Sequence, residues 1–268
     1  MREKPKRVAA VSLRMSEPEV YVLIDEQGRR HLVSLDVTMA RVAGLGVLSA
    51  DKLRANLGRR LSVGDRSVLV LPANRRDRME GLDRKAQVIG PKDAAAILFQ
   101  ADVSPGAVVV EAGVGSAWLT VALAGAVGPR GRVISYEERG DFADFAKANL
   151  QRSGFLDRVE IRVADIAAGI PDRDVDAVIL DLPDPWTAAR AAWEALRIGG
   201  SIATFLPNIE QVRQTVEALR GLPFVEARTV EILERDLEVN ETGTRPSFAP
   251  LGHTGYITTA RKALDKFL

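Results

Sequence analysis

An acidic residue and two glycines follow an apolar run near the middle of the chain, in a pattern that can bind a nucleotide-like ligand. Val108–Val110 predicts a buried strand, Glu111 ends it, and Gly113 and Gly115 form a tight loop before a helical pattern. Glycine has no Cβ, so the backbone can bend sharply there and approach a ligand closely. In α/β enzymes, a loop of this type between strand and helix holds the cofactor.

Two features of this loop favour S-adenosylmethionine over a dinucleotide. Glu111 precedes the first glycine, where a negative charge suits the ammonium group of the methionine and repels a pyrophosphate. Trp118 stands where the dinucleotide fingerprint has its third glycine. We therefore expect S-adenosylmethionine as the cofactor.

Three further acidic residues stand at the ends of predicted strands. Glu137, Asp165 and Asp181 each end or directly follow such a strand. Ligands of open parallel sheets bind beyond the carboxyl ends of the strands. The Glu137 carboxylate can accept both hydroxyls of a ribose, and Asp165 can accept a hydrogen bond from an adenine amino group. The four acidic residues therefore predict one cofactor site.

The loop 181–186 reads Asp-Leu-Pro-Asp-Pro-Trp and predicts a rigid acceptor site. Its two prolines stiffen the backbone and remove two hydrogen-bond donors. Trp186 offers a flat stacking surface, and Asp181 is presented where a methyl group would be delivered. Such a loop suits a flipped nucleobase, so Asp181 is the candidate catalytic carboxylate and Pro183 and Trp186 are candidate base contacts.

Composition excludes several classes of protein. The 268 residues contain no cysteine and two histidines, which makes disulfides impossible and a zinc site improbable. No run approaches the roughly 20 apolar residues that a membrane span needs, and no secretory signal is evident. We expect a cytoplasmic protein without metal or membrane contact.

The net charge of +1 hides an asymmetry along the chain. Residues 1–92 contain 19 basic and 11 acidic residues, whereas residues 93–268 contain 18 and 25. A basic first third predicts contact with a polyanion. The cations expected to contact phosphates are Lys4, Lys6, Arg7, Arg75, Arg76 and Arg78.

The chain is expected to divide into a small β-rich N-terminal domain (1–75), a linker with the start of the catalytic domain (76–92) and an α/β domain (93–268). Short strands are predicted at 20–24, 31–35, around Leu61 and at 67–72. Beyond Pro91 the predicted strands are 107–111, 132–137, 159–164, 177–182 and 201–206, and the predicted helices are 92–100, 116–127, 141–153, 187–196 and 209–220. This alternation predicts a parallel sheet with helices on both faces, and strands 227–233 and 255–260 should add an antiparallel pair at its edge.

With these residues in view, the chain resembles the TrmI-like tRNA (adenine-N1)-methyltransferases, which act on the T-loop. The resemblance covers residues 84–262. The matching stretches are 87–95 (QVIGPKDAA), 111–116 (EAGVGS), 135–137 (SYE) with 141–142 (DF), 180–186 (LDLPDPW), 206–212 (LPNIEQV) and 252–256 (GHTGY).

The resemblance implies a Rossmann-like class I S-adenosylmethionine-dependent methyltransferase with a small N-terminal β domain that contacts tRNA. It implies methyl transfer to N1 of adenine 58, with the neighbouring adenine 57 open as a second target. It also implies a homotetramer, built as a dimer of dimers. The implied cofactor residues are Gln87, Glu111, Gly113, Val114, Gly115, Ser116, Ala117, Glu137, Asp165 and Asp181, and the implied tRNA contacts are Pro183, Trp186, His253, Arg75, Arg76 and Arg78.

The chain departs from the family pattern at a few positions. Gly90 stands where the family usually has a tyrosine near the incoming base, Val114 and Ala117 replace common loop residues, and a histidine-rich N-terminal stretch is missing. Two other functions stay open: a methyltransferase of a protein or small molecule, and a non-catalytic RNA-binding partner subunit. The intact Glu111, Glu137 and Asp181 favour activity over the latter.

Overall fold

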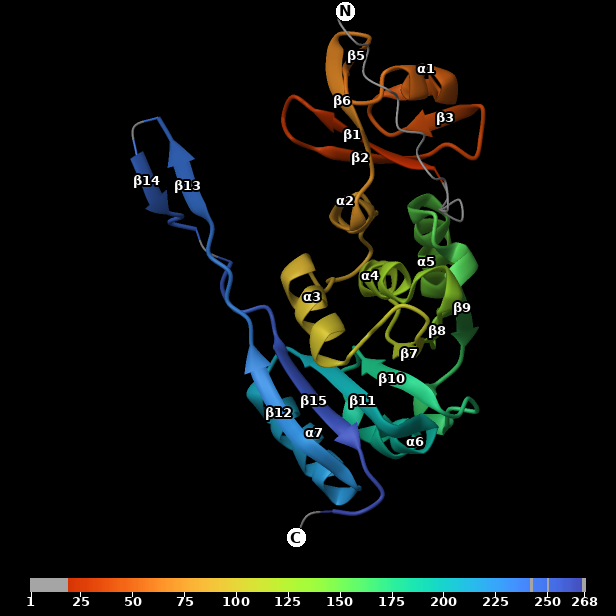
Figure 1. Ribbon diagram of the computed structural model, residues 1–268, viewed down its shortest axis with the longest axis vertical. Coiled ribbons are helices and arrows are strands. Elements are labelled where there is room, and N and C mark those ends of the chain that lie inside the picture. The colour runs from red at the N-terminus through yellow and green to blue at the C-terminus, as the bar shows by residue number, and fades with distance from the viewer. Residues whose placement is uncertain (1–18, 242, 250, 267–268) are drawn as a thin grey trace, which may run out of the picture.

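The computed structural model describes residues 19–241, 243–249 and 251–266, which form two main sheets (Figure 1). The N-terminal sheet is antiparallel with the order β2-β1-β6-β5, and a short ribbon of β3 and β4 and the helix α1 pack beside it. The bounds are β1 Val20–Asp25, β2 Arg30–Ser34, β3 Met39–Val42, β4 Gly46–Ser49, α1 Ala50–Ala55, β5 Arg60–Val63 and β6 Arg66–Pro72.

The large sheet has seven strands in the order β12-β15-β11-β10-β7-β8-β9. Strands β7 to β11 run parallel to one another, and β15 and β12 add antiparallel pairs at one edge, which confirms the predicted architecture. The bounds are β7 Val108–Ala112, β8 Arg132–Glu137, β9 Val159–Val163, β10 Val175–Leu180, β11 Leu196–Leu206, β12 Phe224–Glu231 and β15 Tyr256–Lys262.

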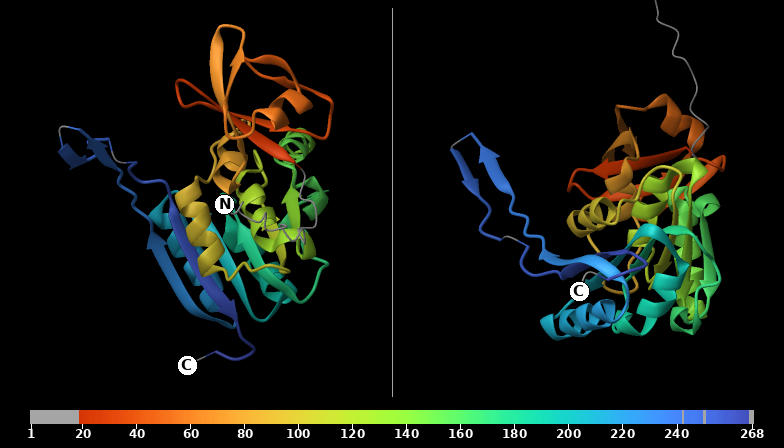
Figure 2. Two further views of the ribbon diagram at one scale, coloured as in Figure 1. Left: turned by 45° about the horizontal axis from the view of Figure 1, so that its top comes forward. Right: turned by 60° about the horizontal axis from the view of Figure 1, so that its bottom comes forward.

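Helices cover both faces of this sheet (Figure 2). Successive residues of a strand point to opposite faces, so Val109 belongs to one buried cluster and Val110 to the other. Residues of α3, α4 and α5 join the first cluster, and residues of α6 and α7 join the second. The bounds are α2 Arg75–Glu80, α3 Pro91–Gln100, α4 Trp118–Val127, α5 Gly140–Ser153, α6 Ala189–Ala195 and α7 Ile209–Gly221.

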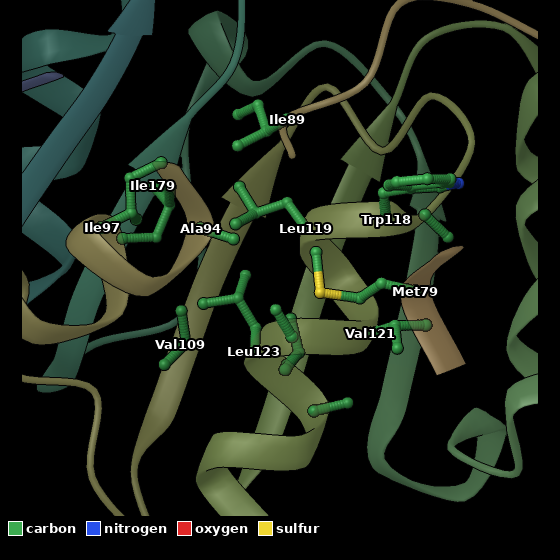
Figure 3. Packing of buried hydrophobic residues seen from close by; sticks show 14 of the residues in the cluster. Met79, Ile89, Ala94, Ile97, Val109, Trp118, Leu119, Val121, Leu123 and Ile179 are labelled. Carbon is green, nitrogen blue, oxygen red and sulfur yellow. The ribbon is translucent and has the colours of Figure 1, made fainter. Parts of the chain in front are cut away.

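The first cluster also ties the N-terminal part to the large sheet (Figure 3). Leu119 and Leu123 of α4 pack among Val109 and Ile179 of the sheet, and Met79 of α2 joins the same cluster. The segment predicted as a linker therefore contains a helix that is docked on the catalytic core. Its start is stabilised by a capping box, in which the side chains of Asn74 and Asp77 accept each other's backbone N–H.

Two features differ from the prediction around residues 185–200. A 3-10 turn, Pro185–Ala188, precedes a shorter α6, and β11 begins at Leu196. Gly199 and Gly200 precede the predicted strand 201–206, but in the structure they lie within β11, where its register against β10 shifts. Gly199 has φ 75°, a left-handed conformation that glycine adopts without strain.

A two-stranded ribbon stands away from the body of the molecule (Figures 1 and 2). It consists of β13 Leu237–Asn240 and β14 Gly243–Pro246, paired antiparallel, and the sequence did not predict it. We call the described residues within 232–253 the arm, because they leave the sheet after β12 and return before β15. None of the described residues belongs to a helix that is long and apolar enough to span a membrane.

Candidate active site

A cleft of about 900 Å³ opens at the carboxyl ends of the parallel strands. Its walls contain six of the residues predicted to bind the cofactor, together with Pro183 of the predicted acceptor loop. Those six are Gln87, Gly113, Gly115, Glu137, Asp165 and Asp181. Gly115 and Asp165 follow β7 and β9, Glu137 is the last residue of β8, and Asp181 directly follows β10, so the sheet order brings all four to one edge.

The glycine loop lies directly against the end of β10. Gly113 has φ 87°, and a Cβ on it would stand 2.1 Å from the carbonyl oxygen of Asp181, so no larger residue fits there. The backbone N–H of Asp181 donates to the Ala112 carbonyl at 2.9 Å and holds the two strand ends together. This contact brings the predicted catalytic carboxylate next to the predicted cofactor loop.

The Glu137 carboxylate is held in place at the end of β8. One oxygen accepts the backbone N–H of Gly115 at 3.2 Å, and the other accepts the backbone N–H of Arg139 at 3.2 Å. The Arg139 guanidinium stacks 3.6 Å from the centre of the Phe142 ring, with its Nε 3.4 Å from the same carboxylate oxygen. A fixed carboxylate on the cleft wall can accept hydrogen bonds from a diol such as ribose.

Asp165 lies at the same end of the cleft, just after β9. Its side chain is exposed and accepts the backbone N–H of Ala167 at 2.7 Å, which starts the 3-10 turn Ile166–Ala168. One carboxylate oxygen is therefore used as a helix cap, and Asp165 still lines the cleft.

Four of the predicted cofactor residues lie beneath the cleft surface. Glu111 is 1% exposed and accepts a hydrogen bond from the Ser135 hydroxyl at 2.7 Å. Val114, Ser116 and Ala117 are also buried, and the Ser116 hydroxyl accepts the backbone N–H of Lys85 at 2.9 Å. These side chains shape the loop from below, and Gly113 and Gly115 line the cleft.

Two carboxyl groups at this site have strongly raised pKa values. Burial raises the pKa of Glu111 to about 7, with a smaller contribution from the nearby charge of Asp181 and against the opposing hydrogen bond from Ser135. Burial of its carboxylate also raises the pKa of Asp181 to about 7, although the residue still borders the cleft. Neither carboxylate pairs with a cation among the described residues, so a cationic ligand would stabilise the charged form of each.

Apart from Pro183, the described residues predicted to contact tRNA do not line the cleft. Trp186 is half-buried and does not line the cleft, in contrast to the exposed stacking surface that we expected. Arg75 and Arg76 are exposed on α2, and Arg76 pairs with Glu80 at 2.8 Å. His253 lies beside the cleft residue Thr254.

Arg78 is not available to a phosphate, which corrects the prediction. It is 6% exposed, donates to the backbone carbonyl of Ser153 and lies 4.8 Å from the centre of the Phe155 ring. The position on the inner face of α2 explains this, because Arg78 comes one residue before the core residue Met79. Lys4, Lys6 and Arg7 lie outside the described residues.

Four cleft residues that the prediction did not single out come from the other half of the sheet. Phe205 lies in β11 and Pro207 directly follows that strand, Gln211 lies in the first turn of α7, and Thr254 precedes β15. The Gln211 side chain donates to the Pro183 carbonyl at 2.7 Å and so fixes the acceptor loop. In the sequence, the signal for these residues was that they lie in or next to the matching stretches 206–212 and 252–256. In the part of the chain that the structure describes, no group of three acidic or histidine residues could hold a metal ion.

Comparison with known proteins identifies the family. The model of the tRNA methyltransferase complex GCD14 subunit matches residues 79–247. The tRNA (adenine(57)-N(1)/adenine(58)-N(1))-methyltransferase TrmI of Methanocaldococcus jannaschii is 37% identical, over 90% of this chain and 94% of that protein. The tRNA (adenine(58)-N(1))-methyltransferase TrmI of Thermus thermophilus is 36% identical, over 68% of this chain and 71% of that protein.

Solved structures agree with the fold. A structure from Thermotoga maritima, described as an S-adenosylmethionine-dependent O-methyltransferase, has 32% identity and a TM-score of 0.80, with 95% of this chain and 96% of that chain covered. The tRNA (m1A58) methyltransferase TrmI of Aquifex aeolicus has 24% identity and a TM-score of 0.72, with 93% and 98% covered. The fold is thus that of the class I methyltransferases, and the chain belongs to the TrmI-like tRNA (adenine-N1)-methyltransferase family.

Proposed function

We propose that the protein transfers the methyl group of S-adenosylmethionine to N1 of adenine 58 in the tRNA T-loop, with adenine 57 as a second target. The observation that carries this proposal is the position of Asp181, which borders a cleft whose opposite end holds Glu137 and Asp165. Membership of the family supports the reaction and the tRNA substrate. A tRNA substrate in turn supports a cytoplasmic protein.

The residues of the cleft fit S-adenosylmethionine. The backbone of Gly113 and Gly115 leaves room for the methionine end, the Glu137 carboxylate would accept the ribose hydroxyls, and Asp165 would accept the adenine amino group. The cleft volume of about 900 Å³ lies near the upper end of the range of roughly 300–1,000 Å³ for ligand pockets, so the cleft suits a large ligand. When bound, the cofactor supplies a methyl group on a positively charged sulfur, which is open to attack by a nucleophile.

The chain itself needs to supply placement and charge stabilisation. N1 of neutral adenine is already a nucleophile, so no strong base is required, and in-line orientation of N1 supplies much of the rate. As N1 takes the methyl group, positive charge develops on the base and the electron pair of the broken bond stays on sulfur. The Asp181 carboxylate would accept a hydrogen bond from the exocyclic amino group and stabilise that charge.

The acceptor loop would hold a base that has left its stack, because N1 is paired in folded tRNA. Pro183 borders the cleft next to Asp181, and the Gln211 side chain holds its carbonyl. Of the cations predicted to contact phosphates, Arg75 and Arg76 are exposed and remain candidates.

A methyltransferase of a small hydroxyl compound is the second candidate, because the Thermotoga maritima structure is described as an O-methyltransferase. A hydroxyl acceptor must lose its proton, and a carboxyl group with a pKa of about 7 can accept it. The Asp181 carboxyl group therefore suits both candidate reactions, and the assay below distinguishes them.

The test is incubation of the protein with S-adenosylmethionine and unmodified tRNA transcript, followed by digestion and mass spectrometry of the nucleosides. We expect 1-methyladenosine to form in the unmodified transcript. It should be absent from a transcript with A→G at position 58 and present in a smaller amount in a transcript with A→G at position 57. Cofactor binding without a methylated nucleoside would favour the small-molecule candidate. Failure to bind the cofactor would favour a non-catalytic partner subunit.

Asp181→Asn should bind the cofactor and lose turnover. The amide keeps the shape of the side chain but cannot stabilise positive charge on the base, so we expect kcat to fall about 100- to 1,000-fold. Calorimetry with S-adenosylhomocysteine should show affinity within about threefold of wild type. Asp157→Asn, an exposed carboxylate away from the cleft, is the matched control and should keep full activity. Unchanged turnover in Asp181→Asn would remove the proposed role.

Activity should rise with pH. The pKa of Asp181 is raised to about 7, so the neutral acid dominates below that pH and the useful carboxylate above it. The profile of kcat/KM for S-adenosylmethionine reports the free enzyme and should show this rise near pH 7. In the kcat profile the rise should lie at lower pH, because the positive sulfur favours the carboxylate. The same rise in Asp181→Asn would assign the titration to Glu111.

We also propose that the protein is a homotetramer, a dimer of dimers, and that the arm takes part in its contacts. A two-stranded ribbon is only marginally stable alone in water, yet the arm that carries this one exposes several large apolar side chains. They are Leu233, Leu237, Val239, Phe248 and Leu251. Residues 233–251 contain four acidic and two basic residues, so a second copy suits this surface better than RNA phosphates do.

The double variant Leu237→Ser/Val239→Ser should therefore have a smaller mass in solution. Both side chains are exposed in the single chain, so their loss should weaken assembly and leave the fold intact. Light scattering after size exclusion measures the mass, and Val47→Ser, an exposed apolar residue of the β3–β4 ribbon, is the control. An unchanged mass in the double variant would exclude this ribbon from the assembly.

A further inference from the structure

Lys92 has an ammonium group that is buried and fully hydrogen-bonded. Its side chain is 6% exposed, and Nζ donates to Asp93 Oδ1 at 2.7 Å, to the Ile232 carbonyl at 2.8 Å and to Thr254 Oγ1 at 2.6 Å. An ammonium has three N–H donors, and all three are used. Lysine is rarely buried unless it is paired, so this one has a specific structural task.

The three acceptors belong to three different segments. Asp93 lies beside Lys92 in the first turn of α3, Ile232 is the first residue of the arm, and Thr254 directly follows the arm. One cation therefore joins a helix of the core to both strands at the root of the arm. Thr254 also lines the cleft.

His253 makes a second connection at the same root. Its Nδ1 lies 2.6 Å from a Glu231 carboxylate oxygen at the end of β12, and its Nε2 lies 2.7 Å from the Pro207 carbonyl at the end of β11. Both partners are hydrogen-bond acceptors, and the hydrogen bond with Glu231 raises the pKa of His253, so both contacts favour the charged ring. Pro207 lines the cleft beside Thr254.

These contacts form the wall of the cleft that lies away from the proposed cofactor residues. The order β15-β11-β10-β7-β8-β9 puts Thr254 and Pro207 on the Asp181 side, and Glu137 and Asp165 at the far side. Gln211, which holds the Pro183 carbonyl, follows Pro207 closely in the chain. The wall that Lys92 supports is thus the one that the methyl acceptor would meet.

We propose that Lys92 is a positioning residue that fixes Thr254 in the acceptor wall of the cleft and couples this wall to the root of the arm. The inference rests on the proposed function, since it concerns the tRNA and not the cofactor. It predicts that loss of the Lys92–Thr254 hydrogen bond weakens use of tRNA and leaves cofactor binding in place.

Thr254→Val is the first variant, because it removes the acceptor hydroxyl with little change of volume. We expect kcat/KM for tRNA to fall roughly tenfold, the effect of losing a hydrogen bond to a charged group. The dissociation constant of S-adenosylhomocysteine should change less than about twofold, because the proposed cofactor residues lie elsewhere. Thr254→Ser restores the hydroxyl and should recover kcat/KM to within about threefold of wild type.

Thr229→Val is the matched control. Thr229 shares a hydrogen bond of 2.8 Å with Thr258 across β12 and β15, and it does not line the cleft. The Thr229→Val variant also loses one hydrogen bond of a threonine hydroxyl, here between β12 and β15, so it measures the purely structural effect of such a loss. We expect normal kcat/KM for tRNA in this variant.

A double-mutant cycle separates positioning from direct contact between Thr254 and tRNA. If Lys92 acts through Thr254, Lys92→Met should lower kcat/KM further in the wild-type background than in Thr254→Val. The Lys92→Met variant leaves Asp93 without its cation and could fail to fold, so binding of S-adenosylhomocysteine is used to check that it is folded. If this variant is not folded, the comparison of Thr254→Val with Thr254→Ser tests the inference alone.

Three results would overturn the inference: equal kcat/KM for tRNA in Thr254→Val and Thr229→Val, an equal loss in Thr254→Val and Thr254→Ser, or fully additive losses in the cycle. Failure of the proposed function would look different, since the wild-type protein would then not methylate tRNA at all.

Discussion

The close approach of Gly113 to Asp181 is the contact on which the rest of the site depends. A side chain at residue 113 would overlap the Asp181 backbone, so only glycine allows the first loop of the sheet to lie against the end of β10. The hydrogen bond from Asp181 to Ala112 then fixes the distance between the two strand ends. A cofactor loop and a carboxylate 68 residues apart in the chain thereby share one wall of one cleft.

Charge at this site follows from the same arrangement. Glu111 ends the first strand beneath the loop, and Asp181 ends the neighbouring strand, so two carboxyl groups lie near each other with high pKa values. Such groups are partly neutral at pH 7 and become charged when a cation arrives. A ligand with a positive sulfur and an ammonium would supply that cation, and so would an adenine that becomes charged on methylation.

Much of this arrangement could be predicted from the sequence, because it depends on local patterns. The parallel strands and their helices were recognised from apolar runs and turns, and the acidic residues from their places at strand ends. What failed was set by tertiary packing. Arg78 looks like a solvated cation in sequence, and only the docking of α2 beside Phe155 buries it. In β13, Leu237 and Val239 alternate with polar residues, but the strand has only four residues and its partner β14, Gly243–Pro246, has no large aliphatic or aromatic side chain, so the pattern is too short to predict a strand pair.

The two halves of the large sheet carry different tasks. The parallel strands β7, β8 and β9 present the loop, Glu137 and Asp165, which are all candidates for cofactor contacts. The antiparallel strands β15 and β12 frame Thr254 and the root of the arm, and Lys92 and His253 join that root to the cleft. Because Asp181 directly follows β10, which lies between the halves, the acceptor wall can change without disturbing the cofactor side. A fold divided in this way can keep one methyl donor and vary its acceptor.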